Sequence, residues 1–255
     1  MAETRDEIGF RGGPLLRFGV VASTMDVAKG LPASDLVTTV VATAQTAGRG
    51  RFDRTWVSPS SGGLYLTVRI PWTRPLSQAP LVSVGAALAL ARVATACGCS
   101  NIVLKWPNDL LLGGAKAAGI LAEMASSDTG SFLLVGVGIN VSIPQRELSE
   151  VGQPAIALSS ACGVQLDPER VLFDFLSEWS SLDQTLESSG FAPLAREFRS
   201  RSDLPGRRFL LSSGATREPV QVKGIRDDGA LEVVRLDTGE TEFVFGGELL
   251  PIGSP

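Results

Sequence analysis

Hydrophobic and polar positions along the chain follow two kinds of pattern, and each kind predicts one type of element. Short β-rich runs over 35–45 and 62–71 predict strands. The segment between them, Gln45–Trp56, reads QTAGRGRFDRTW and holds three arginines and two glycines. Because glycines mark irregular backbone, this positively charged stretch is predicted to be a loop between two strands.

Two longer segments predict helices. The run over 80–97 is rich in alanine and leucine, is apolar on most sides and starts with a proline, so we expect a buried helix. The segment 168–188 has apolar residues at helical spacing, which predicts a helix with one buried stripe. That stripe consists of Val171, Leu172, Phe175, Leu176, Trp179, Leu182 and Leu186.

Further strand-like runs complete an α+β pattern. They lie at 101–106, 117–125 and 131–143. After Leu204-Pro205 the chain changes to short strands with turn residues at Asp228-Gly229 and Gly239, which predicts a small barrel. We therefore expect two domains, 1–204 and 205–255.

Composition and charge narrow the class of protein. Hydrophobic residues make up 44% of the 255 and charged residues 20%, which is typical of a globular protein with a filled interior. The net charge of -4 argues against a protein that mainly grips nucleic acid. The N-terminus lacks the order of a signal peptide, and no apolar run reaches roughly 18 residues without a charge, so we expect a cytoplasmic protein that does not span a membrane.

Histidine is absent and cysteine is scarce. Without histidine the chain lacks the commonest general base and the commonest transition-metal ligand. The three cysteines, Cys97, Cys99 and Cys162, form neither a C-x-x-C pair nor an even set, so we expect neither a disulfide framework nor a zinc site.

The arginine-rich loop has the chemistry of an anion site. Gly48 and Gly50 let the backbone turn its N–H groups toward a ligand, and Arg49 and Arg51 carry planar guanidinium groups that suit carboxylate or phosphate. The alternative is a solvated, mobile loop without a ligand.

The block 104–123, LKWPNDLLLGGAKAAGILAE, carries a second group of cations. A turn at 107–109 and a hairpin through Gly113-Gly114 would place Lys105 and Lys116 on neighbouring strands, where their ammonium groups could converge. The alternative is an ordinary hairpin with surface lysines.

The segment LLVGVGINVSI resembles a nucleotide fingerprint only superficially. Val141 stands at the third glycine position and β-type residues follow instead of a helix, so the dinucleotide motif is excluded. A G-x-x-x-x-G-K-[ST] loop is also missing from the sequence, so any ATP needs another kind of site. Asn140 is either a ligand to a metal-bound phosphate or a turn residue.

The segment ASTMDVAK is typical of a helix start. Ser23 and Asp26 have the spacing of a capping box. Ser23 or Thr24 could instead offer a hydroxyl group to a polar ligand, and the spacing does not decide between these roles.

Taken together and in this order, these segments resemble biotin protein ligases. The resemblance covers about Phe18 to Val141, and GALEVVRLDTGETEFVFGGE near the C-terminus resembles the family's SH3-like barrel. It implies a biotin/lipoate ligase-like domain with a mixed sheet and helices. It also implies an activity: biotin and ATP give biotinyl-5'-AMP, and biotin then passes to a lysine of a biotin carboxyl carrier domain.

The resemblance assigns roles to residues. The arginine loop is implied to be disordered without ligand and to close over biotin and the adenylate, and Mg²⁺ accompanies the ATP. Asp109 could accept the proton of the incoming amine. Lys116, Arg49 and Arg51 are the implied catalytic cations, and the implied binding residues are Ser23, Thr24, Gln45, Gly48, Arg49, Gly50, Arg51, Trp56, Lys105, Asn108, Lys116, Gly119 and Asn140.

Some positions depart from the family pattern. Met25 stands where asparagine is frequent, Thr43 where glutamate is frequent, and Phe52-Asp53 replace a stretch that often holds glycine. Only about twenty residues precede the first motif, too few for a helix-turn-helix, so we expect a ligase without DNA binding, as a monomer or weak homodimer. The alternatives are a lipoate ligase or octanoyl transferase, and a module that only stores biotin.

Overall fold

The structure is a computed structural model that describes residues 3–32, 34–127, 130–213 and 216–252. Its larger part is an eight-stranded mixed sheet in the order β1-β2-β3-β4-β8-β7-β6-β5, in which only the β2–β3 pair is parallel. The strands are β1 (Glu3–Ile8), β2 (Pro14–Val21), β3 (Thr38–Gln45), β4 (Gly63–Pro71), β5 (Ile102–Lys105), β6 (Asp109–Leu112), β7 (Ala115–Ser127) and β8 (Gly130–Asn140). The expected mixed sheet with helices is confirmed.

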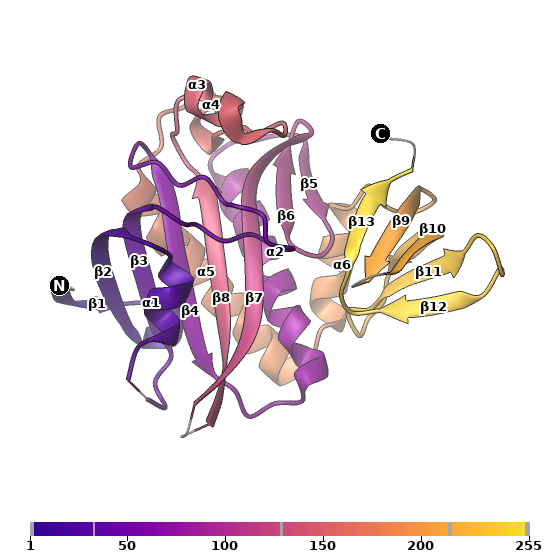
Figure 1. Cartoon of the computed structure of the whole chain (residues 1–255), viewed down its shortest axis with the longest axis horizontal. Coiled ribbons are helices and arrows are strands. Elements are labelled where there is room, and N and C mark those ends of the chain that lie inside the picture. The colour runs from indigo at the N-terminus through magenta and orange to yellow at the C-terminus, as the bar shows by residue number, and fades with distance from the viewer. Residues whose placement is uncertain (1–2, 33, 128–129, 214–215, 253–255) are drawn as a thin grey trace.

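Helices cover the two faces of this sheet unequally (Figure 1). The long helices α2 (Ala79–Ala96) and α5 (Pro168–Ser189) pack on one face, and the short α1 (Thr24–Lys29) packs on β3, β4 and β8 on the other. All seven residues of the predicted stripe on α5 are buried, as expected. Short helical segments complete this part: η1 (Phe10–Gly12), η2 (Leu76–Gln78), α3 (Gln145–Leu148), η3 (Ser149–Val151) and α4 (Leu158–Cys162).

Helix α2 forms the centre of the core. It is buried nearly all round because α5 covers the side that the sheet does not. By length and composition, the helical stretch 76–96 could cross a membrane, although the sequence analysis predicts no membrane-spanning segment. In the structure, 78% of its apolar window is buried inside the protein. Its hydrophobicity is therefore used for packing within the fold.

A second, smaller sheet follows α6 (Ala192–Ser200). Its antiparallel strands have the order β12-β11-β10-β9-β13, and within the described ranges the two outer strands, β12 and β13, do not pair with each other. The closed SH3-like barrel is therefore not confirmed, and the sheet is open. The strands are β9 (Arg208–Ser213), β10 (Thr216–Ile225), β11 (Leu231–Arg235), β12 (Thr241–Val244) and β13 (Glu248–Pro251).

The smaller sheet packs against helix α2 of the larger part. The tight turn at Gly229, between β10 and β11, has a positive φ of 85° and lies against Leu81 of α2 and Phe191. A side chain at Gly229 would collide with Leu81, so this glycine lets the smaller sheet approach the core helix closely.

The structure contains one disulfide, which the expectation of no disulfide framework did not foresee. Cys99 and Cys162 form it, joining the turn after α2 to the last turn of α4 across 63 positions of sequence. An odd number of cysteines excludes a complete set of pairs but not a single pair. The remaining thiol, Cys97, is half-buried, and burial raises its pKa.

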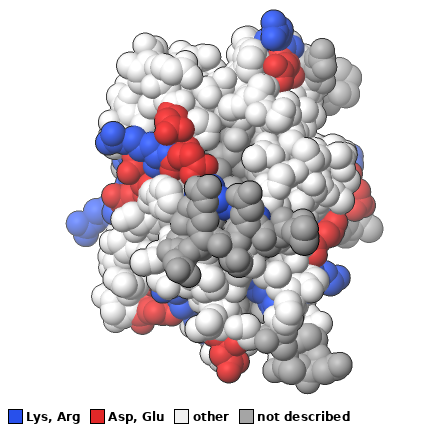
Figure 2. Space-filling model, turned by 90° about the vertical axis from the view of Figure 1, so that its left-hand side faces the viewer, with Lys and Arg blue, Asp and Glu red and all other residues white. Residues whose placement is uncertain are grey.

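Charged side chains are scattered on the face next to β1 and β2 (Figure 2). Lysine and arginine side chains lie among acidic ones there, and most of the described surface in this view is uncharged. The described residues on this face form no broad basic field of the kind that binds a nucleic-acid backbone.

Candidate active site

A cavity of about 470 Å³ opens where the arginine-rich loop crosses the sheet. Its size suits a small molecule or cofactor. The lining comes from the start of α1, the loop, strands β5 to β8, the segment 151–153 and the start of β13. Residues from distant parts of the chain therefore meet at one place.

The loop forms an irregular hairpin over this cavity. Arg49 pairs with Thr55, Gly50 N–H donates to the Arg54 carbonyl at 2.7 Å, and Trp56 N–H donates to the Gly48 carbonyl at 2.9 Å. At the tip, Phe52 and Asp53 have φ values of 56° and 57°, a backbone region that favours glycine. Glycine would adopt this backbone conformation at lower cost than phenylalanine or aspartate.

A hydrogen-bonded polar group occupies one end of the cavity. The backbone N–H and the hydroxyl of Thr24 donate to Gln45 Oε1 at 2.8 and 3.2 Å, and Gln45 Nε2 donates to Ser58 Oγ at 2.9 Å. Ser23 Oγ accepts from Met25 N–H at 3.2 Å, which confirms the predicted helix cap. These bonds fix the polar atoms before any ligand arrives.

Trp56 forms one wall of the cavity, and two glycines make room for it. A Cβ at Gly138 would lie 2.4 Å from Trp56 Nε1, and a Cβ at Gly119 would lie 2.9 Å from Trp56 Cζ3. Similarly, Gly136 leaves room for Met25 Sδ. The glycines of VGVG therefore make room for the side chains of Met25 and Trp56. Trp56 Nε1 is buried and has no hydrogen-bond partner among the described atoms.

Lys116 lies at the centre of the cavity. Its Nζ is 2.9 Å from Asp109 Oδ1 and 5.3 Å from the centre of the Trp56 ring, and both charged side chains are mostly buried. The segment after η3 holds the backbone of Lys116: its N–H donates to the Pro154 carbonyl, and its carbonyl accepts from Ile156 N–H. Asp109 therefore holds the ammonium group of Lys116, while the segment 154–156 holds its backbone.

Lys105 and Asn140 are placed differently from the predictions. β6 separates the strands of Lys105 and Lys116, so the expectation of neighbouring strands is wrong, although both lysines line the cavity. Asn140 is not part of the lining. Its Nδ2 donates to the carbonyl of Lys116 at 3.3 Å and to that of Ile156 at 3.5 Å, so it supports the lysine from behind.

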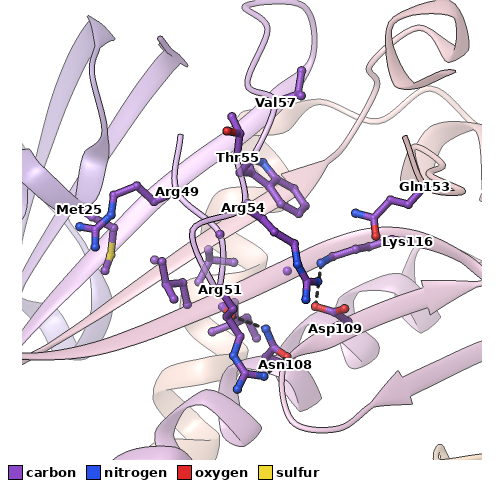
Figure 3. Close-up of a pocket in the computed structure, with 18 of the residues that line it drawn as sticks. Met25, Arg49, Arg51, Arg54, Thr55, Val57, Asn108, Asp109, Lys116 and Gln153 are labelled. Carbon is purple, nitrogen blue, oxygen red and sulfur yellow. Dashed lines mark hydrogen bonds and ion pairs between the residues drawn. The ribbon is translucent and has the colours of Figure 1, made fainter. Parts of the chain in front are cut away.

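Arg49 and Arg51 of the loop point in different directions (Figure 3). Arg51 donates to Asn108 Oδ1 at 3.1 Å and to the Gly247 carbonyl at 2.7 Å, whereas Lys116 pairs with Asp109, the residue that follows Asn108. Burial lowers the pKa of Arg51. Arg49 also lines the cavity, but its guanidinium lies at the other end, on Glu123. The three predicted catalytic cations thus line one cavity, with Arg49 on Glu123 and with Arg51 and Lys116 on the adjacent residues Asn108 and Asp109.

Known proteins share this arrangement. A model of the Biotin/lipoate A/B protein ligase family matches residues 18–140. The biotin--[acetyl-CoA-carboxylase] ligase of Paracoccus denitrificans is 32% identical over 235 residues, which cover 89% of this chain and 96% of that protein. The chain belongs to this family. A solved biotin protein ligase from Aquifex aeolicus, in complex with biotin and ATP, is 27% identical with a TM-score of 0.74, and the match covers 92% of this chain and 96% of that one.

A second group of relatives in the family is longer. The bifunctional ligase/repressor BirA of Escherichia coli is 32% identical over 196 residues, which cover 75% of this chain and 60% of that protein. The chain therefore spans less than two thirds of this relative.

Sequence reasoning missed several cavity residues of this family member. Gln153 and Glu248 both line the cavity, and Arg54 forms an ion pair with Glu248. Glu248 follows a Gly-Gly pair near the C-terminus, and its position in the cavity depends on how the smaller sheet packs. Composition alone carries no signal for that contact.

Proposed function

We propose that the chain is an ATP-dependent biotin protein ligase. It forms biotinyl-5'-AMP from biotin and ATP and transfers the biotin to a lysine of a biotin carboxyl carrier domain. One observation carries this proposal: a single cavity joins a prepared polar end at Thr24 and Gln45, an apolar wall at Trp56, and two cations, Arg51 and Lys116, that are held on the adjacent residues Asn108 and Asp109.

The first half-reaction requires positive charge more than proton transfer. The biotin carboxylate is ionised at neutral pH, because carboxylic acids titrate near about 4.5. One carboxylate oxygen attacks the α-phosphorus of ATP, and pyrophosphate leaves. Arg51 and Lys116 stabilise the charge that develops on the phosphate oxygens. A chain without histidine can perform this chemistry.

In the second half-reaction a carrier lysine attacks the carbonyl carbon of the mixed anhydride. AMP leaves and an amide bond forms. Lys116 stabilises the oxyanion and the departing phosphate. Asp109 accepts the amine proton; its Oδ1 is already 2.9 Å from Lys116 Nζ, so the two side chains act as a pair.

Magnesium enters as part of the substrate MgATP. The described residues contain no group of three histidine, cysteine, aspartate or glutamate side chains that could hold a metal ion. Mg²⁺ commonly keeps phosphate and water oxygens as ligands and uses only one or two carboxylates. Asn108 and Asp109 are the side chains with oxygen atoms beside Arg51 and Lys116.

The finer organisation is also part of the proposal. Division into a catalytic domain, 1–204, and a C-terminal domain, 205–255, is supported by the separate hydrogen bonding of the two sheets. Five short antiparallel strands support an SH3-like relationship for the second domain. A cytoplasmic location and a monomeric or weakly dimeric state belong to the same proposal.

Incubation with ATP, labelled biotin and a carrier domain tests the function. We expect the label to become covalently attached to the carrier. We also expect pyrophosphate to exchange into ATP only when biotin is present. Retention of biotinyl-5'-AMP without transfer would support a storage module instead. Activation of lipoate in preference to biotin would support a lipoate ligase.

A further inference from the structure

Acidic side chains hold Arg49 at the rim of the cavity. Its Nη2 donates to both carboxylate oxygens of Glu123, at 2.6 and 2.7 Å, and its Nη1 lies 3.4 Å from Asp26 Oδ1. Glu123 belongs to β7, the strand of Lys116, and Asp26 belongs to the first turn of α1. Two elements that do not belong to the loop therefore meet its first arginine.

We propose that Glu123, with Asp26, is a positioning residue that fixes the arginine-rich loop through Arg49. In this role the guanidinium of Arg49 does not contact the acyl-phosphate. The inference rests on the proposed ligase function and changes the role of one predicted catalytic cation.

Backbone hydrogen bonds link the position of Arg49 to the residues that line the cavity. Arg49 pairs with Thr55, and the carbonyl of its neighbour Gly48 accepts from Trp56 N–H at 2.9 Å, so both arms of the hairpin move with Arg49. One arm places the Trp56 indole against Gly138. On the other arm, Arg51 lies two residues further on and reaches Asn108 and the carbonyl of Gly247.

Strand β7 carries both Glu123 and the proposed catalytic lysine, Lys116. The register shift between β6 and β7 lies at 116–118, and Gly119 and Leu121 of β7 line the cavity. Side chains alternate between the two faces of a strand, so Glu123 faces the same side of the sheet as positions 119 and 121, where the loop lies. β7 thus supplies Lys116 at the centre of the cavity and a carboxylate for the loop at its rim.

Exposure limits the strength of this anchor. Side-chain exposure is 38% for Arg49, 34% for Glu123 and 57% for Asp26, so water screens the charges. An exposed pair alone contributes little, whereas two carboxylates on one guanidinium give a more stable geometry. We therefore expect a change of about threefold to tenfold in the loop's behaviour and no collapse of the fold.

The test compares Glu123→Gln with Arg49→Gln and with the double variant. We expect Glu123→Gln to speed tryptic cleavage after Arg51 and Arg54 by about threefold or more, and to raise the KM for biotin about threefold to tenfold with a smaller change in kcat. Arg49→Gln should have a similar effect, and the double variant should be no worse than either, because all three remove one interaction.

Glu169→Gln is the matched control. Glu169 accepts two hydrogen bonds from Arg17, at 3.0 and 2.7 Å, in a pair of the same type outside the cavity lining. We expect this variant to show parental proteolysis and parental KM.

Two results would overturn the anchor. One is parental cleavage and parental KM in Glu123→Gln. The other is a loss of kcat beyond about a hundredfold in Arg49→Gln alone, which would place Arg49 at the reacting groups. Proteolysis needs no biotin transfer. A failure of the proposed function would instead appear as an inactive parental protein, with the cleavage comparison still readable.

Discussion

Replacement of Gly138 by alanine tests whether the position of Trp56 shapes the ligand cavity. The new Cβ would lie 2.4 Å from both Nε1 and Cε2 of Trp56 and 2.8 Å from Cζ2. Carbon atoms pack best at about 3.5 to 4.0 Å, so the indole has to move by about 1 Å. Gly119 and the Lys116 side chain lie close to the same ring, so the movement cannot be absorbed in that direction.

The size of the effect follows from this displacement. Overpacking of a filled site costs about 1 to 3 kcal/mol, and a binding group displaced by about 1 Å can cost about a hundredfold in rate. For Gly138→Ala we expect the KM for biotin to rise about tenfold to a hundredfold, while the free energy of unfolding falls by about 1 to 3 kcal/mol.

Biotin-dependent exchange of pyrophosphate into ATP measures the kinetic effect, and urea unfolding measures stability. Gly19→Ala is the matched control, because Gly19 is also a strand glycine but a Cβ there meets nothing within 4 Å. A KM within twofold of the parental value in a folded Gly138→Ala protein would refute the role given to the Trp56 wall.

Three further changes test other parts of the site and fold. Lys116→Met should lower the rate of adenylate formation at least a hundredfold while the protein stays folded. A well-placed cation stabilises the transition state by about 2.7 to 4 kcal/mol, and pyrophosphate exchange measures its loss. Glu248→Gln removes the ion pair with Arg54 and should raise the KM for ATP severalfold, in an ATP titration at saturating biotin. Cys162→Ser opens the disulfide loop of 63 positions and should lower the free energy of unfolding by about 2 to 4 kcal/mol, with no further loss on adding reductant.

The elements that sequence patterns predicted best are those with one strong period. On α5, seven apolar residues at helical spacing are all buried, because a stripe of that width must face a core. The β3 and β4 runs were also predicted within three residues of their observed ends. By contrast, β1 and β2 were not predicted, because β2 is mostly half-buried or exposed and its pattern shows no regular alternation.

Contacts between distant segments could not be predicted in the same way. The hairpin at Gly113-Gly114 was recognised, but the short strand β6 between Lys105 and Lys116 was not, so the lysines were expected to be closer in the sheet than they are. Cys99 and Cys162 meet only because α4 returns to the end of α2. Spacing in sequence carries no information about such returns.

Charge in the cavity is arranged in pairs, which explains how a chain of net charge -4 builds an anion site. Lys116 faces Asp109, Arg54 faces Glu248, and Arg51 is held by an amide oxygen and a carbonyl. Each partner offsets part of the cost of burying a cation. The same partners hold each cation in a fixed place, so an arriving phosphate meets donors that are already oriented. Arg51 donates to two neutral oxygens, and the nearby carboxylates of Glu248 and Asp109 favour its charged form against the cost of burial. The composition of the whole chain therefore says little about the sign of the field where the chemistry takes place.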